Sequence, residues 1–383
     1  MKIAILTQPL HTNYGGTLQA YALQKVLTNL GYTPETINYR KRLSKPHLLK
    51  IFLSKIKQLI KSGRVYYNFT NRDYGEISLL HSDFIKRYIN YSVEINNVHD
   101  LNGYINKNGF NAIVIGSDQT WRPKYSPRIE SFYLDFIAKN NNINKIAYAA
   151  SFGTSSWEYT PELTKRCGDL LKSFNFVSVR EVSGVELCKR KFGVQAEHVL
   201  DPTMLLNLND YQKFIDLEYF KENEGKIFCY VLDEQNEKNS IIEKIVKIKN
   251  KGLFSTFPEK KRKEEFFISD YSLYQYPSIE LWLTSYAAAD FIITDSFHGT
   301  VFSIIFNKPF IAIANEERGS ARFTSLLELF HLENRLVSHK GQITNELIET
   351  EIDYEPVNRK LYELKEICME RLHKSLTRSE VQE

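Results

Sequence analysis

A histidine lies between a short apolar run and a stretch with helical spacing, in the segment Asp295-Ser296-Phe297-His298-Gly299-Thr300. The apolar run at residues 291–294 predicts a buried strand, and aspartate and serine are residue types that begin helices. At such a junction the free backbone N–H groups and the helix dipole attract an anion, and an imidazole can carry a proton near neutral pH. The position therefore indicates proton transfer beside an anionic ligand, although a histidine that only caps the helix or satisfies the core fits it equally well.

Polar or glycine residues also follow three other predicted strands. The strand at residues 3–7 leads into Asn13-Tyr14-Gly15-Gly16, the strand at 112–115 into Gly116-Ser117-Asp118-Gln119-Thr120-Trp121, and the strand at 176–179 into Arg180. Because open α/β sheets bind ligands at the carboxyl ends of their strands, these segments predict a binding edge. The paired glycines allow a ligand to approach the backbone closely, and an ordinary tight turn explains them as well.

Strands alternate with helices along the chain, which is typical of an α/β fold with doubly wound parallel sheets. The chain turns polar and helical around residues 206–224, and a new strand begins near 226. This break predicts an N-terminal domain at 1–205, a C-terminal domain at 206–345 and a closing helix within 346–383. The glycines match neither the GxGxxG nor the GxxxxGK[ST] spacing, so neither a dinucleotide fingerprint nor a Walker loop is supported.

The composition is that of a globular protein without a nucleic-acid partner. The chain has 383 residues, 43% of them hydrophobic, and a formal net charge of only +4. Four cysteines are scattered with no metal-ligand spacing, which predicts reduced thiols and no metal site. Because the first apolar run is short and no run approaches a membrane span, we expect a cytoplasmic protein without a signal peptide. A basic helical insertion near residues 41–90 could touch the inner membrane surface, and a solvated helix face is the alternative.

Four blocks, in this order, resemble the polysaccharide pyruvyl transferase family. They are Asn13-Tyr14-Gly15-Gly16 with the helix that follows, Gly116-Ser117-Asp118-Gln119, Ser178-Val179-Arg180-Glu181, and Asp295-Ser296-Phe297-His298-Gly299-Thr300 with Lys308-Pro309. Each block alone is weak, but their order and separation are specific at the level of the family. The resemblance covers the chain from residue 1 to about residue 335.

The resemblance implies a GT-B-like arrangement, in which two Rossmann-like domains face a cleft. It implies transfer of pyruvate from phosphoenolpyruvate onto two hydroxyls of one sugar, giving a ketal, in bacterial capsule, exopolysaccharide or cell-wall polymer synthesis. The acceptor would be a nucleotide- or polyprenyl-diphosphate-linked sugar at the cytosolic face, bound on the N-terminal domain, with the donor on the C-terminal domain. Phosphoenolpyruvate would be the co-substrate, and no other cofactor is expected.

This resemblance assigns roles to the candidate residues. His298 would protonate the donor methylene or accept a hydroxyl proton. Where some family members carry an arginine, two residues before the histidine, this chain has Ser296. The donor anions would then rest on other groups, for which the candidates are Arg180, Ser296, Gly299, Lys308, Arg318 and Arg322. The acceptor candidates are Asn13, Tyr14, Gly15, Gly16, Ser117, Asp118, Gln119 and Trp121, with Trp121 stacking on a sugar ring.

Two other functions fit the same patterns. A GT-B glycosyltransferase with a nucleotide-sugar donor would share the fold and a basic cleft, so fold alone does not separate the two. A non-catalytic subunit that binds glycan is the second alternative. For several candidates a structural role is an equal alternative: a salt bridge for Arg180, surface charge for Arg318 and Arg322, packing for Trp121, and helix capping for Asp295.

Overall fold

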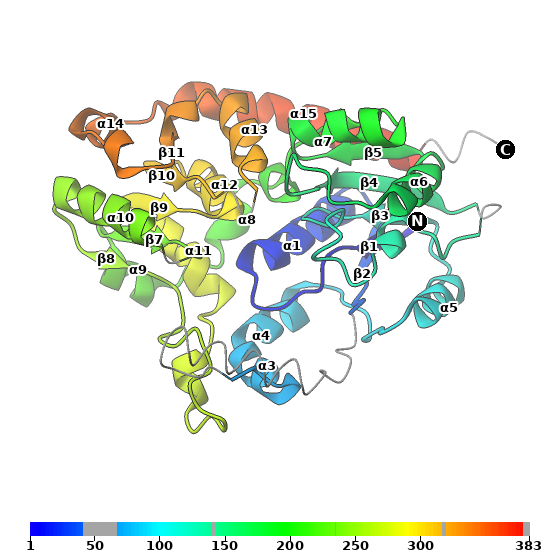
Figure 1. The fold of residues 1–383 in the computed structure, drawn as a ribbon, viewed down its shortest axis with the longest axis horizontal. Helices are drawn as coiled ribbons and strands as arrows, with labels where there is room; N and C mark the ends of the chain where they lie inside the picture. The colour runs from blue at the N-terminus through cyan, green and yellow to red at the C-terminus, as the bar shows by residue number, and fades with distance from the viewer. Residues whose placement is uncertain (41–66, 139–141, 234, 316–318, 378–383) are drawn as a thin grey trace.

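The computed structural model describes residues 1–40, 67–138, 142–233, 235–315 and 319–377. It contains two parallel β-sheets, each flanked by helices, in two lobes that lie side by side (Figure 1). The predicted α/β class with two Rossmann-like domains is therefore confirmed. No helix in these ranges is long and apolar enough to cross a membrane.

The first sheet holds six parallel strands in the order β2-β1-β3-β4-β5-β6. Most of its strands are short apolar runs buried on both faces, as expected for parallel sheets covered by helices. The strands are β1 (Lys2–Leu6), β2 (Thr33–Thr36), β3 (Ala112–Ile115), β4 (Asn144–Ala150), β5 (Phe176–Val179) and β6 (Glu197–His198). The helices of this lobe are α1 (Tyr14–Asn29), α3 (Asn71–Ile77), α4 (Leu79–Tyr88), α5 (Val98–Asn108), α6 (Pro161–Leu171) and α7 (Val182–Leu187).

The second sheet holds five parallel strands in the order β11-β10-β9-β7-β8. The strands are β7 (Ile227–Tyr230), β8 (Leu253–Phe254), β9 (Phe291–Thr294), β10 (Phe310–Ile313) and β11 (Leu336–Val337). The helices are α8 (Leu208–Gln212), α9 (Leu217–Asn223), α10 (Asn236–Lys249), α11 (Ile279–Ala288), α12 (Phe297–Ile305), α13 (Ala321–Leu329), α14 (Asn345–Glu349) and α15 (Tyr354–Thr377).

In each sheet the second strand along the chain is added on one side of the first, and the third strand is added on its other side. The winding direction therefore reverses between β1 and β3 in the first sheet and between β7 and β9 in the second. At such a switch point the segments that leave the two neighbouring strands diverge, which opens a crevice at the carboxyl edge of the sheet. The predicted binding segments after β1, β3 and β9 all begin at these two switch points.

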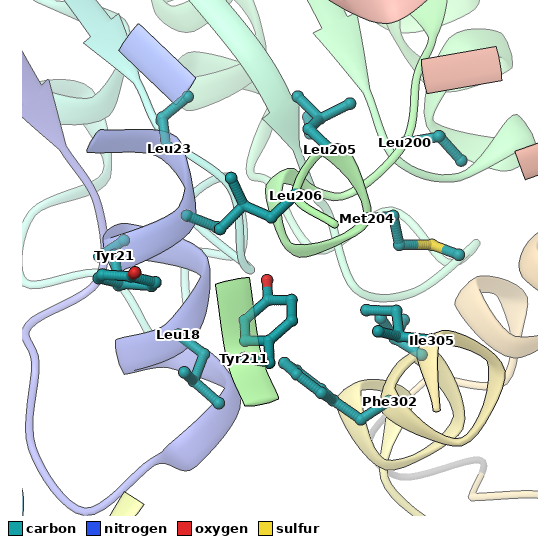
Figure 2. Packing of buried hydrophobic residues seen from close by; sticks show 14 of the residues in the cluster. Leu18, Tyr21, Leu23, Leu200, Met204, Leu205, Leu206, Tyr211, Phe302 and Ile305 are labelled. Carbon is teal, nitrogen blue, oxygen red and sulfur yellow. The ribbon is translucent and has the colours of Figure 1, made fainter. Parts of the chain in front are cut away.

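The lobes share one hydrophobic core rather than touching only at their surfaces. Figure 2 shows Leu18 and Tyr21 of α1 on one side of Tyr211 and Phe302 of α12 on the other. The Tyr211 hydroxyl donates to the carbonyl of Thr203 at 2.8 Å, so this buried ring is also satisfied at its polar end. Packing of this kind restricts the relative movement of the lobes, because separating them would expose the core.

The helix α15 belongs to both lobes. It begins beside the second sheet, where the Tyr354 hydroxyl donates to the Lys308 carbonyl at 2.6 Å. It ends beside the first sheet, where Asn144 Nδ2 donates to the Ser375 carbonyl at 2.8 Å (Figure 1). The strands of the first sheet all precede residue 206, the boundary that the sequence suggests, and those of the second sheet all follow it. The closing helix α15 contacts both lobes.

Only part of the expected insertion near 41–90 can be described, because residues 41–66 lie outside the described ranges. The described part is only partly exposed to solvent. Thr70 caps α3, Asp73 is buried, and Phe84 and Ile85 of α4 belong to the shared core. This part of the insertion therefore packs against the body of the protein.

Candidate functional site

A pocket of about 370 Å³ lies between the carboxyl edges of the two sheets. Residues that follow β1 and β3 line it from the first lobe, and residues that follow β7 and β9 line it from the second. Both switch points thus contribute to one site, which is where open α/β sheets bind ligands. Its lining residues are His11, Thr12, Asn13, Asp118, Gln119, Tyr230, Leu232, Phe257, Lys261, Tyr276, Asp295, Ser296, Phe297, His298 and Arg322.

His298 lies in the first turn of α12, on the wall of this pocket. The Ser296 hydroxyl caps the helix by accepting from the Gly299 N–H at 3.3 Å. The imidazole is only 6% exposed and packs against Gly15 of α1, where a side-chain carbon would collide with the ring. A glycine in the first turn of α1 is therefore what allows a histidine from the other lobe to lie there.

A buried carboxylate of the first lobe faces this histidine. Asp201 Oδ2 lies 3.6 Å from His298 Nε2, and it accepts from Ser117 Oγ at 2.8 Å and from Arg180 Nη1 at 2.9 Å. The other oxygen, Oδ1, accepts from the backbone N–H and hydroxyl of Thr203. Burial alone would raise the pKa of the Asp201 carboxyl, but the charges and hydrogen bonds around it hold that pKa well below its usual range.

Arg180 does not line the pocket but forms ion pairs with two carboxylates. Its side chain is fully buried, and its guanidinium joins Asp201 to Asp118, whose Oδ1 lies 3.0 Å from Arg180 Nη2. It also lies 4.6 Å from the centre of the Phe297 ring, which separates it from the pocket surface that Phe297 forms. Arg180 was expected to contact the donor, and the structure places it in an ion-pair network within the first lobe, outside the pocket lining.

Two side chains bring positive charge to the described pocket wall. Arg322 lies in the first turn of α13 with its guanidinium 5.5 Å from the Phe297 ring. Burial, followed by the charge of Arg180, lowers the pKa of Arg322 to about 10, so it is still charged at neutral pH. Lys261 is exposed and holds its Nζ 4.1 Å from the centre of the Phe257 ring. Either side chain can bind a phosphate or carboxylate group.

Three of the predicted acceptor residues line the pocket and five do not. Asn13, Asp118 and Gln119 are on the wall, and Asp118 adopts a left-handed backbone with φ of 76°. The structure places Gly15 and Gly16 within α1 and buries Ser117 against Asp201. Tyr14 and Trp121 are also outside the pocket lining.

The two aromatic acceptor candidates are core residues. Trp121 is fully buried, stacks on Tyr133 at 5.2 Å and donates from Nε1 to the Phe132 carbonyl. It therefore has no open face for a sugar ring. Tyr14 stacks on Trp282 and donates to the Pro277 carbonyl at 2.8 Å, both from the second lobe. Its place in the structure is at the contact between lobes.

The remaining donor candidates differ in location. Lys308 precedes β10, at the opposite edge of the sheet from the pocket, where its Nζ donates to the Ala287 carbonyl at 2.7 Å. The structure therefore places Lys308 outside the pocket lining. Gly299 is buried, and a side chain there would collide with Thr294 of β9. Arg318 lies outside the described residues.

The sequence suggested that Asp295 caps α12, but Ser296 is the capping residue. The buried carboxylate of Asp295 accepts from Lys238 Nζ at 2.6 Å and from the Leu232 N–H at 2.7 Å. These bonds join the end of β9 to the end of β7 and to α10. Asp295 thus holds together the switch point of the second sheet.

Several pocket residues had no assignment from the sequence. His11 and Thr12 lie in the loop after β1, so their position at a strand end was a usable signal. Asp201 is not a lining residue but lies 3.6 Å from His298, and its position after β6 was an equally usable signal. Lys261 lies in a charged run that reads as a solvated loop, and Tyr276 and Phe257 belong to the same connection. No pattern in the sequence indicates that this connection returns to the pocket.

Comparison with known proteins gives one family and one type of fold. A sequence model described as polysaccharide pyruvyl transferase matches residues 13–317. No curated protein matches the chain.

Solved structures match over nearly the whole chain, at low identity. A putative UDP-N-acetylglucosamine 2-epimerase from Listeria monocytogenes has a TM-score of 0.55 at 7% identity, covering 100% of this chain and 97% of that one. The S. aureus MnaA–UDP co-structure has a TM-score of 0.51 at 14% identity, covering 98% and 96%. Arabidopsis thaliana UGT89C1 complexed with UDP-L-rhamnose has a TM-score of 0.52 at 11% identity, covering 99% and 98%. These similarities show a GT-B fold.

Proposed function

This chain belongs to the polysaccharide pyruvyl transferase family, and from that premise we propose that it moves pyruvate from phosphoenolpyruvate onto two hydroxyls of one sugar. The product is a pyruvate ketal in bacterial capsular, exopolysaccharide or cell-wall polymer synthesis. The family supports the broader statement that the protein is a transferase with a pyruvyl transfer role in polysaccharide synthesis. One observation carries the finer proposal: His298 lies on the wall of a pocket that also presents two cationic side chains.

The proposed reaction needs a proton at one carbon and a place for two anions. Protonation of the donor methylene makes a methyl group and leaves an oxocarbenium-like carbon, which one sugar hydroxyl attacks. Loss of phosphate regenerates such a carbon, and the second hydroxyl closes the ring. Of the two hydroxyl protons, one replaces the proton given to the methyl group and the other leaves with phosphate. His298 handles these transfers, since an imidazole gains and loses protons near neutral pH.

The donor end of the pocket is built from Arg322, Lys261 and the start of α12. Arginine matches a carboxylate with two parallel hydrogen bonds, whereas lysine offers a point charge to phosphate. The free N–H groups and dipole at the start of α12 favour an anion at the same place. Ser296 supplies no charge here, and Arg322 and Lys261 provide the charge that an arginine at that position would bring.

The acceptor end is built from Asn13, Asp118 and Gln119 of the first lobe. Amide and carboxylate groups of this kind bind sugar hydroxyls by donating and accepting hydrogen bonds. The acceptor in this proposal is a sugar on a nucleotide or polyprenyl diphosphate, presented at the cytosolic face of the membrane. No cofactor besides phosphoenolpyruvate takes part.

The test is a phosphate-release assay with phosphoenolpyruvate and a panel of sugar acceptors, with mass spectrometry of the products. We expect phosphate release that depends on the acceptor, and a product heavier by one pyruvic acid minus one water. The variant His298→Ala should lower kcat by about 10²–10⁴-fold, the usual contribution of a positioned acid or base. Turnover of a UDP-sugar without phosphoenolpyruvate would instead assign the protein to the glycosyltransferases, and binding of glycan without any turnover would make it a non-catalytic subunit.

A further inference from the structure

We propose that Asp201 is a positioning residue for His298: a carboxylate of the first lobe holds the imidazole of the second lobe by its Nε2 side. The inference deepens the proposed function and rests on it for the identity of the substrate. The pairing of the two side chains rests on geometry alone. Neither residue is near the other in sequence, and they meet only because both lobes border one pocket.

The carboxylate is firmly held, so it can fix the position of the ring. The side chain of Asp201 is fully buried and accepts hydrogen bonds on both oxygens from Ser117, Arg180 and Thr203. A group with this many partners cannot rotate away from His298 without breaking several of them. Its direction toward the imidazole is therefore a property of the folded first lobe.

The two ring nitrogens of His298 have different surroundings. Nε2 is buried without a hydrogen-bond partner in the described structure and lies 3.6 Å from Asp201 Oδ2. That separation is longer than a hydrogen bond, and a shift of about 0.5 Å would bring it into the usual range for a charge-assisted bond. Nδ1 lies on the side of Gly15, and His298 lines the pocket. A proton held on Nε2 by Asp201 leaves Nδ1 to exchange protons with the substrate.

Charged groups from several elements surround the imidazole of His298. Two carboxylates, Asp118 at the end of β3 and Asp201 after β6, share the single guanidinium of Arg180 at the end of β5. Arg322 of α13 and His11 of the loop after β1 also face the pocket, and Glu181 next to Arg180 has a pKa raised by its burial. Of the charged groups in the described part of the chain, the Asp201 carboxylate lies 3.6 Å from the ring nitrogen Nε2.

The first measurement is the titration of His298 by NMR, with ¹³C-labelled histidine in the full chain and the signal assigned with His298→Gln. In Asp201→Asn we expect the titration midpoint to fall by about one pH unit, because a neutral amide no longer stabilises the imidazolium. The limb of the pH profile of kcat/KM that reports His298 should move by the same amount and in the same direction, whether the histidine acts as acid or base. A merely structural role for Asp201 would lower thermal stability and leave the midpoint in place.

Asp73→Asn is the matched control, because Asp73 is another buried carboxylate in an ion pair but lies away from the pocket lining. It should leave the His298 midpoint unchanged. If Asp201→Asn does not fold, Ser117→Ala replaces it. That variant removes one donor from Oδ2, leaves more of the negative charge for the imidazole and should raise the midpoint.

The outcomes separate the inference from the proposed function. A midpoint in folded Asp201→Asn equal to that of the wild type, or in Ser117→Ala if only that variant folds, overturns the inference even if ketal formation is observed. A shifted midpoint in a wild-type protein that makes no ketal from any acceptor supports the pairing and refutes the proposed reaction. A shift in both the NMR midpoint and the pH profile supports both.

Discussion

At the scale of single residues, the position two before the histidine supplies no charge. Ser296 uses its hydroxyl to cap α12, and the positive charge of the described wall comes from Arg322 and Lys261, on other elements. Arg322 is buried and fixed, whereas Lys261 is exposed and rests on Phe257. We therefore expect the two cations to differ in donor binding: Arg322 fixes the position of an anion from a buried side chain, and Lys261 adds charge from an exposed one.

Lys261→Ala should raise KM for phosphoenolpyruvate about tenfold, which corresponds to about 1.4 kcal/mol of lost binding. The loss is modest because the side chain is exposed and water screens its charge. Steady-state kinetics at saturating acceptor measures this effect. Lys260→Ala is the matched control, because Lys260 lies next in the same loop but pairs with Glu264 and is not part of the pocket wall. Equal KM values in the two variants would show that Lys261 does not bind the donor.

At the scale of elements, the site forms where the first turns of α1 and α12 lie against each other. The first turn of α1 carries Gly15, and the first turn of α12 carries His298, whose ring occupies the space that a side chain at position 15 would need. Asn13 and Ser296 cap these two helices with the same type of bond to the N–H three residues on. The close approach of the two elements thus depends on a missing side chain.

Gly15→Ala should lower kcat by at least tenfold, because the new methyl group pushes the imidazole out of position. In an ordinary helix the same change would stabilise the protein by about 0.5–1 kcal/mol. Gly103→Ala in α5 is the control, since a side chain there meets nothing within 4 Å. We expect Gly103→Ala to keep activity and gain stability in a denaturation experiment. Full activity in Gly15→Ala would contradict the described position of His298.

At the scale of the whole molecule, the lobes are joined at several places around the pocket. The shared core and α15 lie on one side, and Tyr14 binds the second lobe through its hydroxyl. Near the loop that carries Lys261, Lys263 of the second lobe forms a buried ion pair with Asp73 of α3 at 2.6 Å. This pair holds the connection between β8 and β9 against the first lobe.

Lys263→Met should lower the free energy of unfolding by about 1–3 kcal/mol, the cost of leaving a buried polar group unpaired. Burial raises the pKa of Asp73, but Lys263, Thr70 and Tyr271 outweigh it and lower that pKa below its ordinary value. The stabilisation from the pair is therefore full above about pH 4 and is lost as the pH falls further. Urea denaturation of wild type and variant should differ at pH 7 and converge in acid. A constant difference at every pH would mean that the ion pair is not its source.

The sequence by itself determined the α/β class, the bounds of the strands at residues 112–115, 176–179 and 291–294, and the position of His298 at a strand-to-helix junction. These features depend on local patterns: short apolar runs make buried strands, and Ser296 with the following helical spacing makes a helix start. The presence of Asn13, Asp118 and Gln119 on the pocket wall could also be predicted from the sequence, because polar residues at the carboxyl ends of parallel strands gather at one edge of the sheet.

Only the tertiary structure decided which of these side chains share a surface. Trp121 and Lys308 have suitable chemistry, but one is fully buried and the other lies at the opposite sheet edge. Asp201 and Lys261 reach the site from other parts of the chain, the first to within 3.6 Å of His298. The physical reason is that burial and ion pairing depend on contacts between distant segments, which the local pattern of neither segment contains.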